Sequence, residues 1–189
     1  MSLLFILLLP SATFAQALTA REAAELVKER LPVPEDAKEF TSDYSEFEGR
    51  GQWEFQWTSK KGNVSATLDA ESKDIISYYA WGEDYEGQST LVPKISKAQA
   101  IAAAQDFLKK AAPGKYGSLE LAKQVPERPI LYSYNRDYNF YFERIVNGIH
   151  CPSMGAQFTV SAATGKVTNY SMDWDYKGQF PAAGKVITS

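Results

Sequence analysis

Large apolar and polar residues alternate along several short stretches of the chain, and this alternation predicts β-strands. The clearest stretch runs from Gln52 to Trp57, where Trp53, Phe55 and Trp57 occupy every second position. A period of two is typical of a strand with one face in the core and the other toward solvent. The same pattern predicts further strands at residues 64–68, 75–81, 138–146, 156–160 and 166–174.

Residues 18–31 predict a helix instead. Thr19 can cap its first turn, and Glu22 stands three residues later, which is the spacing of a capping box. The apolar residues of this segment recur every four positions and so share one helix face; they are Ala23, Val27 and Leu31.

Residues 95–110 predict a second helix with the same start signal, Ser96 followed by Gln99. Its apolar face consists of Ile101, Ala104, Leu108 and Ala111. Each predicted helix is followed by strands that turns separate. This order predicts the α+β class, in which a helix packs on one face of an antiparallel sheet.

The order of elements in the first half of the chain repeats in the second half. A shift of 92 positions brings Leu68 onto Val160 and Tyr78 onto Tyr170. We therefore predict an internal duplication with two modules, each a helix packed on a curved antiparallel sheet. The predicted boundaries are module 1 at 18–81, a linker at 82–94, module 2 at 95–176 and a C-terminal tail at 177–189.

The N-terminus has the features of an export signal. Residues 3–9 are all apolar, and Ala15 and Ala17 flank Gln16 in the small-x-small pattern that signal peptidase cleaves. The apolar run is too short to cross a bilayer as a helix. We predict a signal peptide at residues 1–17, no membrane insertion after its cleavage, and a secreted or cell-wall-associated bacterial protein. The alternative for this run is a buried N-terminal strand.

The charge and the cysteine content of the chain argue against several classes of partner and cofactor. The chain has 20 Lys and Arg against 23 Asp and Glu, a net charge of −3, which argues against a large nucleic-acid interface. It also argues against electrostatic docking on anionic lipid. With a single cysteine, the chain can form no intrachain disulfide and no multi-cysteine metal site.

The candidate chemical groups do not form a convincing catalytic set. The only histidine and cysteine, His150 and Cys151, are neighbours in an extended segment, where consecutive side chains point to opposite faces. Asp173 and Asp175 would share one strand face, where a weak cation site is conceivable but a solvated strand end is the expected state. The sequence contains no phosphate-loop motif. We predict no catalytic residues, no metal and no cofactor.

One segment of the second half carries a more specific pattern. It consists of Arg144-Ile-Val-Asn-Gly-Ile-His-Cys-Pro152, Gly155, Val160, Thr164-Gly-Lys-Val167, Tyr170 and Trp174. The pattern resembles the YcdB/YcdC repeated domain of bacterial cell-envelope proteins. That domain is similar to the PepSY group and to propeptides of thermolysin-like metallopeptidases. The resemblance covers both modules and is stronger in the second.

The resemblance implies a helix on a curved sheet, export, and association with surface-layer or peptidase-bearing proteins. It implies no established enzyme activity, and peptidase inhibition is the role usually proposed for PepSY-like domains. Two departures occur at the predicted turns. Ser161 stands where the family usually has an acidic residue, which the first module keeps as Asp69. Lys73 stands where the second module has Gly165.

Most residues of the pattern are interpreted as structural. Asn147-Gly148 is a strong hairpin signal because both residues tolerate positive φ, and Thr164-Gly165 is interpreted in the same way. For partner binding we predict an aromatic row with a nearby cation, consisting of Tyr78, Trp81, Arg144, Tyr170 and Trp174. About half of the aromatic residues should lie in the core, and Trp81 and Trp174, near strand ends, are the best candidates for exposure.

Three functions compete on this evidence. The first is an exported, non-enzymatic protein-binding module that restrains or escorts a secreted peptidase or binds another envelope protein. The second is a structural module of the cell envelope or surface layer without inhibitory activity. The third is an unrecognised hydrolase, which would need carboxylates that converge in a pocket.

Overall fold

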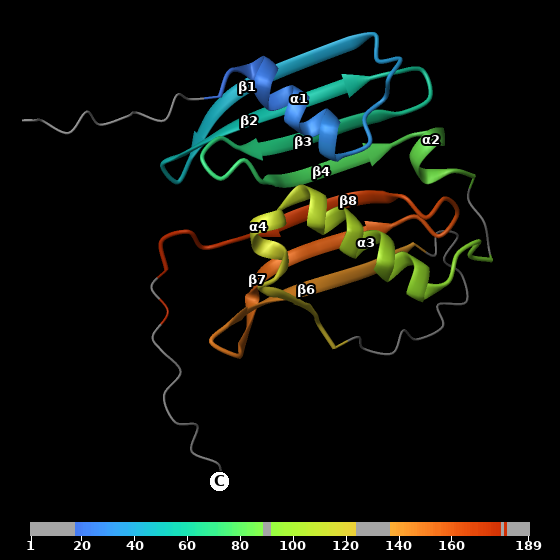
Figure 1. Ribbon diagram of the computed structural model, residues 1–189. Helices are drawn as coiled ribbons and strands as arrows, with labels where there is room; N and C mark the ends of the chain where they lie inside the picture. Colours follow the sequence, from blue (N-terminus) through green and yellow to red (C-terminus); the bar gives the residue numbers. More distant parts are fainter. Residues whose placement is uncertain (1–17, 89–91, 124–136, 179, 181–189) are drawn as a thin grey trace, which may run out of the picture.

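The computed structural model describes residues 18–88, 92–123, 137–178 and 180 (Figure 1). In chain order the elements are α1 (Ala20–Arg30), β1 (Glu39–Phe47), β2 (Arg50–Thr58), β3 (Asn63–Asp69), β4 (Ile75–Trp81), α2 (Glu83–Glu86), α3 (Lys97–Ala111), α4 (Pro113–Tyr116), β5 (Leu119–Leu121), β6 (Tyr138–Val146), β7 (Ile149–Val160) and β8 (Val167–Asp173). The two predicted helices correspond to α1 and α3. The six predicted strands correspond to β2, β3, β4, β6, β7 and β8. The predicted signal peptide, residues 1–17, lies outside the described residues.

The strands form one antiparallel sheet in the order β1-β2-β3-β4-β8-β7-β6-β5. The α+β class is confirmed. The prediction of a separate sheet in each module needs correction, because β4 and β8 pair with each other and Tyr78 lies opposite Tyr170. In two separate sheets, β4 and β8 would each be an edge strand with unpaired backbone groups, and their pairing satisfies these groups.

The helices cover one face of this sheet (Figure 1). The helix α1 packs on β1, β2 and β3, and α3 packs on β6, β7 and β8. Alternate strand residues point toward the helices and form the core, together with the apolar helix faces; large members are Val27, Phe55, Leu68, Leu108, Phe142 and Phe158. Within the described part of the chain, no helix covers the opposite face.

Two residues predicted for partner binding belong to this core. Tyr78 and Tyr170 are each 1% exposed, so they present no surface to a partner, and their role is corrected to packing. The hydroxyl of Tyr78 donates to the carbonyl of Pro32 at 2.8 Å. Burial raises the pKa values of both phenols well above their ordinary range. Tyr78 and Tyr170 lie opposite each other on the paired strands β4 and β8. The alternation in the sequence separates the two faces of each strand, but it does not indicate which face the helices cover.

The helix start signals and the Asn147-Gly148 turn signal are confirmed, whereas Thr164 does not adopt the positive φ expected for a two-residue turn. Thr19 and Glu22 form a reciprocal capping box, with the Thr19 N–H donating to the Glu22 carboxylate at 2.9 Å, and Ser96 begins α3 in the same way. Asn147 and Gly148, with φ of 52° and 77°, make the two-residue hairpin between β6 and β7. Gly165 also has positive φ, at 75°, but it lies in a longer turn between β7 and β8.

The predicted linker is partly structured and packed against the second half of the chain. Residues 83–86 form α2, and Tyr85 within it is buried. The Thr164 hydroxyl donates to the Tyr85 carbonyl at 2.5 Å, and the Ser161 hydroxyl donates to the Glu86 carbonyl at 2.9 Å. Burial raises the pKa of Tyr85 to about 12. Of the predicted tail, residues 177–189, the structure describes 177, 178 and 180, and the Lys177 ammonium donates to the Glu48 carbonyl at 2.9 Å.

A buried carboxylate organises the turn between β3 and β4. Asp69 is 1% exposed and accepts hydrogen bonds from Arg50 Nε and Nη2, each at 2.7 Å. Its Oδ1 atom also accepts the backbone N–H of Ser72 at 2.7 Å. Burial raises the pKa of this carboxyl, but the hydrogen bonds from Arg50 and Ser72 outweigh burial and hold the pKa below its usual value.

We expect acid to remove the stabilising contribution of Asp69. An unfolded aspartate has a pKa of about 3.9, and that of folded Asp69 is lower. Its contribution to the free energy of unfolding is therefore complete above the unfolded pKa and is lost as the pH falls through the folded pKa. In urea unfolding between roughly pH 5 and pH 2, Asp69→Asn should respond less to acid than wild type. Parallel curves for the two proteins would contradict this prediction.

Candidate functional site

The strand β1 is an open edge of the sheet. It pairs with β2 in register over all nine residues, Glu39–Phe47, and no described strand lies on its other side. All of its residues except Ser42 are exposed. In an edge strand, every second residue points its N–H and C=O away from the sheet, which allows another strand to pair there.

The strand lacks several of the devices that usually protect such an edge, although its acidic side chains are one of them. It contains no proline, no lysine and no bulge relative to β2. The strand at the opposite edge of the described sheet, β5, has only three residues, Leu119–Leu121. Of the two edges, β1 therefore offers by far the longer row of backbone groups to a partner.

Aromatic packing on the helix side holds β1 in place. The rings of Phe40 and Trp57 are 5.5 Å apart, and those of Tyr44 and Trp53 are 5.0 Å apart. Phe40 and Tyr44 nevertheless remain 49% and 50% exposed. Their outer surfaces form an apolar strip along the open edge, which an added strand could cover.

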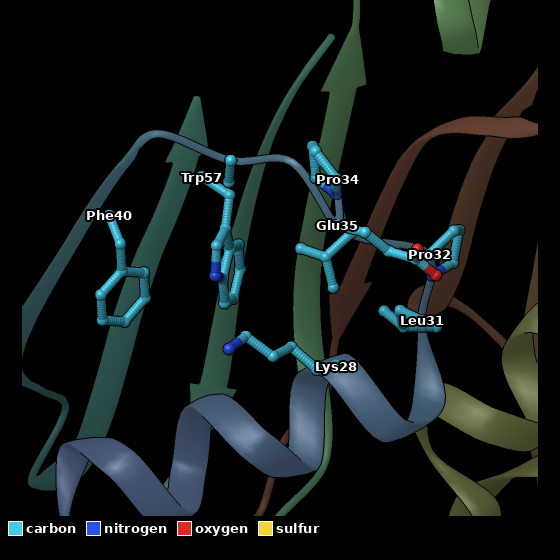
Figure 2. A pocket seen from close by; sticks show the side chains of 9 residues that line it. Lys28, Leu31, Pro32, Pro34, Glu35, Phe40 and Trp57 are labelled. Atoms are coloured by element: carbon cyan, nitrogen blue, oxygen red, sulfur yellow. The ribbon is translucent and has the colours of Figure 1, made fainter. Parts of the chain in front are cut away.

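A pocket of about 580 Å³ opens beside the start of β1 (Figure 2). It lies between the end of α1, the connection to β1, and the sheet. Its lining consists of Lys28, Leu31, Pro32, Val33, Pro34, Glu35, Ala37, Phe40 and Trp57. Figure 2 shows Phe40 and Trp57 on the sheet side, with Lys28 reaching toward the Trp57 ring from α1. Seven of the nine lining residues are apolar and two are charged, so the pocket could take an apolar side chain of a segment bound along β1.

The edge is acidic. The strand and the hairpin that follows it carry Glu39, Asp43, Glu46 and Glu48, and β1 contains no basic residue. Asp43 lies opposite Glu54 of β2, so two like charges face each other across the ladder. A basic side chain on an added strand would relieve this repulsion, and the edge therefore favours a partner with Lys or Arg.

The remaining residues predicted for partner binding do not form one surface. Because β4 and β8 run antiparallel, Trp81 at the end of β4 and Trp174 just past β8 lie at opposite ends of the sheet. The Arg144 guanidinium lies 4.0 Å from the centre of the Trp174 ring and donates to the Asp175 carbonyl at 3.1 Å. Trp81 is stacked on Tyr79, with ring centres 5.2 Å apart.

Sequence reasoning missed the β1 edge and its pocket. The segment 39–47 contains Phe40 and Tyr44 four residues apart, but Ser42 between them breaks the apolar alternation. The β propensity of its Phe, Thr and Tyr residues was the available signal. The pocket depends on the approach of residues 28–37 to Trp57, which no local pattern encodes.

The residues considered as catalytic or metal-binding candidates, His150, Cys151 and Asp175, form hydrogen bonds away from the β1 edge. His150 Nδ1 lies 2.9 Å from the Glu143 carboxylate, whereas the Cys151 thiol donates to the Ile149 carbonyl at 3.8 Å. Asp175 lies beyond β8, and its carboxylate accepts the N–H groups of Lys177 and Gly178, each at 2.8 Å. Among the described residues, no three His, Cys, Asp or Glu side chains are grouped so that they could hold a metal ion.

No helix within the described ranges has the length and apolar character needed to span a bilayer.

Comparison with solved structures finds the C-terminal domain of YpeB from Bacillus megaterium, with a TM-score of 0.66 and 16% sequence identity. The alignment covers 89% of this chain and 70% of that chain, and it establishes a common fold. A Clostridium difficile 630 protein described as a candidate lipoprotein aligns at 14% identity over 81% of this chain and 91% of that chain. Its TM-score of 0.28 does not indicate a common fold.

Comparison with curated protein sequences finds no match. The family model described as "YcdB, YcdC repeated domain" matches residues 20–174, which run from the first residue of α1 to just past β8. The match therefore includes both capped helices, the complete sheet and the open edge strand. It confirms the resemblance based on the segment from Arg144 to Trp174, and the chain belongs to the family of the YcdB, YcdC repeated domain.

Proposed function

We propose that this chain is a non-enzymatic, extracellular or envelope-associated domain that binds an extended segment of a partner protein along β1. The observation that carries the proposal is the open nine-residue edge, which runs beside a pocket lined by both apolar and charged residues. Backbone hydrogen bonds along β1 would supply affinity, and the pocket would select the side chain at one position. The acidic residues of the edge favour a basic segment.

The extracellular location rests on the predicted signal peptide at residues 1–17 and on the family. We propose a secreted peptidase as the partner, which the domain restrains or escorts. Support comes from the resemblance to propeptides of thermolysin-like metallopeptidases. The second candidate is a structural module of the envelope or surface layer, which the resemblance to cell-envelope proteins favours.

The proposal includes the internal duplication. The pairing of β3 with β4 and that of β7 with β8 each skip one residue, Ile76 and Thr168, at positions 92 residues apart. Asp69 and Ser161, which occupy corresponding positions in the two halves, both accept turn N–H groups through their side chains. These coincidences support two copies of one module. The described strand β5 takes the place of β1 in the second copy but is much shorter, so β1 would be the strand that kept the binding role.

The test is capture of partners by the chain without residues 1–17, from the secretome and wall extract of its source. We expect Phe40→Ser combined with Tyr44→Ser to reduce capture by about five- to thirtyfold, because about 1–2 kcal/mol of apolar contact is removed at the edge. Ile149→Ser is the matched control, since Ile149 is 55% exposed and lies at a distant hairpin. Quantitative mass spectrometry measures the captured proteins.

Hydrogen exchange provides the second measurement. Amides of β1 should exchange more slowly once the captured partner is added, while those of the β6–β7 hairpin should not change. Equal capture by the β1 variant and wild type, or unprotected β1 amides, would contradict the proposal. A peptidase whose cleavage of a fluorogenic peptide slows in the complex supports restraint. Surface-layer proteins as the specific partners favour the structural module.

A further inference from the structure

The face of the sheet opposite the helices has an unusual composition over its four central strands. In β3, Val64 and Ala66 are buried under the helices, so their neighbours point to the other side. We call this surface the bare face. Its residues on β3, β4, β8 and β7 are Asn63, Ser65, Thr67, Ser77, Tyr79, Trp81, Asn169, Ser171, Asp173, Gln157 and Thr159.

The strand register arranges these residues in straight rows across the sheet. One row follows the paired positions from β2 to β6 and consists of Gln56, Ser65, Tyr79, Asn169, Thr159 and Asn139. A second row, followed over the same strands, consists of Glu54, Thr67, Ser77, Ser171, Gln157 and Tyr141. Neighbouring strands lie about 4.8 Å apart, so the first row extends over about 24 Å. Such a row suits an elongated ligand that lies across the strands.

An aromatic platform stands at the middle of the bare face. Tyr79 and Trp81 alternate along β4, one of the two strands at the centre of the sheet. Their rings are stacked with centres 5.2 Å apart and planes inclined by 29°. Tyr79 is 48% exposed. Trp81 is less exposed than Tyr79, so the stacked pair offers mainly the ring surface of Tyr79, and the C–H groups on one side of a sugar ring pack on aromatic rings.

Ten of the eleven positions of the bare face carry no charge, although charged residues make up 23% of the chain. The exception is Asp173 at the end of β8, and Glu54 of β2 lies beside Thr67 at the margin of the face. Hydroxyl and amide side chains can both donate and accept hydrogen bonds, as the hydroxyl groups of a sugar do. Nucleic acid or anionic lipid would require Lys or Arg here. The cores of protein interfaces are typically rich in Met and Arg besides aromatic residues, and neither occurs among these eleven positions.

We propose that the bare face binds a neutral glycan chain. A sugar ring stacks on Tyr79 and Trp81, and the rows of Ser, Thr, Asn and Gln hydrogen-bond to the neighbouring sugar hydroxyls. This site is separate from the β1 edge, because Phe40 and Tyr44 pack on the helix side of the sheet. The glycan site therefore adds to the proposed protein binding and does not depend on it.

The test uses the chain without residues 1–17 and two uncharged probes, cellohexaose and the hexamer of N-acetylglucosamine. Isothermal titration calorimetry should show saturable binding of at least one probe, and none of an acidic polygalacturonate oligomer. Trp81→Ser and Tyr79→Ser should each weaken that binding at least tenfold. Ile149→Ser is the matched control, since Ile149 is similarly exposed at the distant β6–β7 hairpin, and it should bind as wild type does.

Three results would overturn the glycan proposal. They are the absence of saturable binding of both probes by wild type, undiminished binding by folded Trp81→Ser and Tyr79→Ser variants, and a dimer in solution that Tyr79→Ser dissociates. The third result would assign the bare face to a second copy of the chain. Thermal unfolding of each variant establishes that it is folded. Partner capture by the Trp81→Ser variant should equal that of wild type, so failure of one proposal is distinguishable from failure of the other.

Discussion

Replacing Lys115 with alanine is expected to lower the free energy of unfolding by about 3–5 kcal/mol. The Lys115 ammonium forms an ion pair with the Asp74 carboxylate, and both residues are buried, at 7% and 6% exposed. Removal of the lysine would leave the carboxylate in the protein interior without its counter-charge, which is the costly way to break a buried pair.

The position of this pair makes the effect large. Lys115 lies on α4 in the second half of the chain, and Asp74 lies just before β4 in the first half. The ammonium also lies over the rings of Trp174 and Tyr176, 5.4 Å and 4.8 Å from their centres. These cation–π contacts would be lost together with the ion pair. In the Lys115→Ala variant we therefore expect the two halves of the sheet to unfold less cooperatively, in addition to the lower free energy of unfolding.

Urea unfolding followed by circular dichroism measures the change. Lys110→Ala provides the control, because Lys110 is exposed on α3, and its free energy of unfolding should change by less than about 0.5 kcal/mol. The double variant Lys115→Met with Asp74→Leu should recover most of the loss, since it removes both charges and fills the space. A loss below about 1 kcal/mol for Lys115→Ala would refute the prediction.

Gly155→Ala is expected to destabilise the fold by about 2–6 kcal/mol, combining about 1–3 for backbone strain and about 1–3 for overpacking. Gly155 has φ of 156°, and a Cβ at this position would overlap the carbonyl oxygen of Phe142. Gly155 lies opposite Glu143, next to the irregular pairing between β6 and β7. The clash is with backbone, which cannot rotate away as a side chain can.

Substitutions at two other glycines distinguish the cost of backbone strain from the cost of the steric clash. Gly148 has φ of 77°, and no atom lies within 4 Å of the place that a Cβ would take, so Gly148→Ala should cost only the strain, about 1–2 kcal/mol. Gly117 has φ of −68° and the same open surroundings, so Gly117→Ala should be neutral or slightly stabilising. Urea unfolding ranks the three variants. A cost for Gly155→Ala no greater than that for Gly148→Ala would show that β7 shifts to relieve the clash.

Features that depend on neighbours within a few residues could be predicted from the sequence. The capping boxes at Thr19 and Ser96 specify where two helices begin, because the cap and its partner are three residues apart. The Asn147-Gly148 hairpin follows from two residues that tolerate positive φ. Alternation indicated six strands, and the pattern from Arg144 to Trp174 indicated the family that the comparison confirmed.

The choice of neighbouring strands, and with it the exposure of each residue, emerged only from the tertiary structure. A period of two identifies the two faces of a strand but not its partner, so nothing in the sequence indicated that β4 pairs with β8 and buries Tyr78 and Tyr170. The open edge of β1 and the rows of the bare face exist only because that pairing makes one sheet of eight strands. Strand pairing joins residues far apart in the chain, and its energy depends on the packing of the complete sheet, which local patterns do not contain.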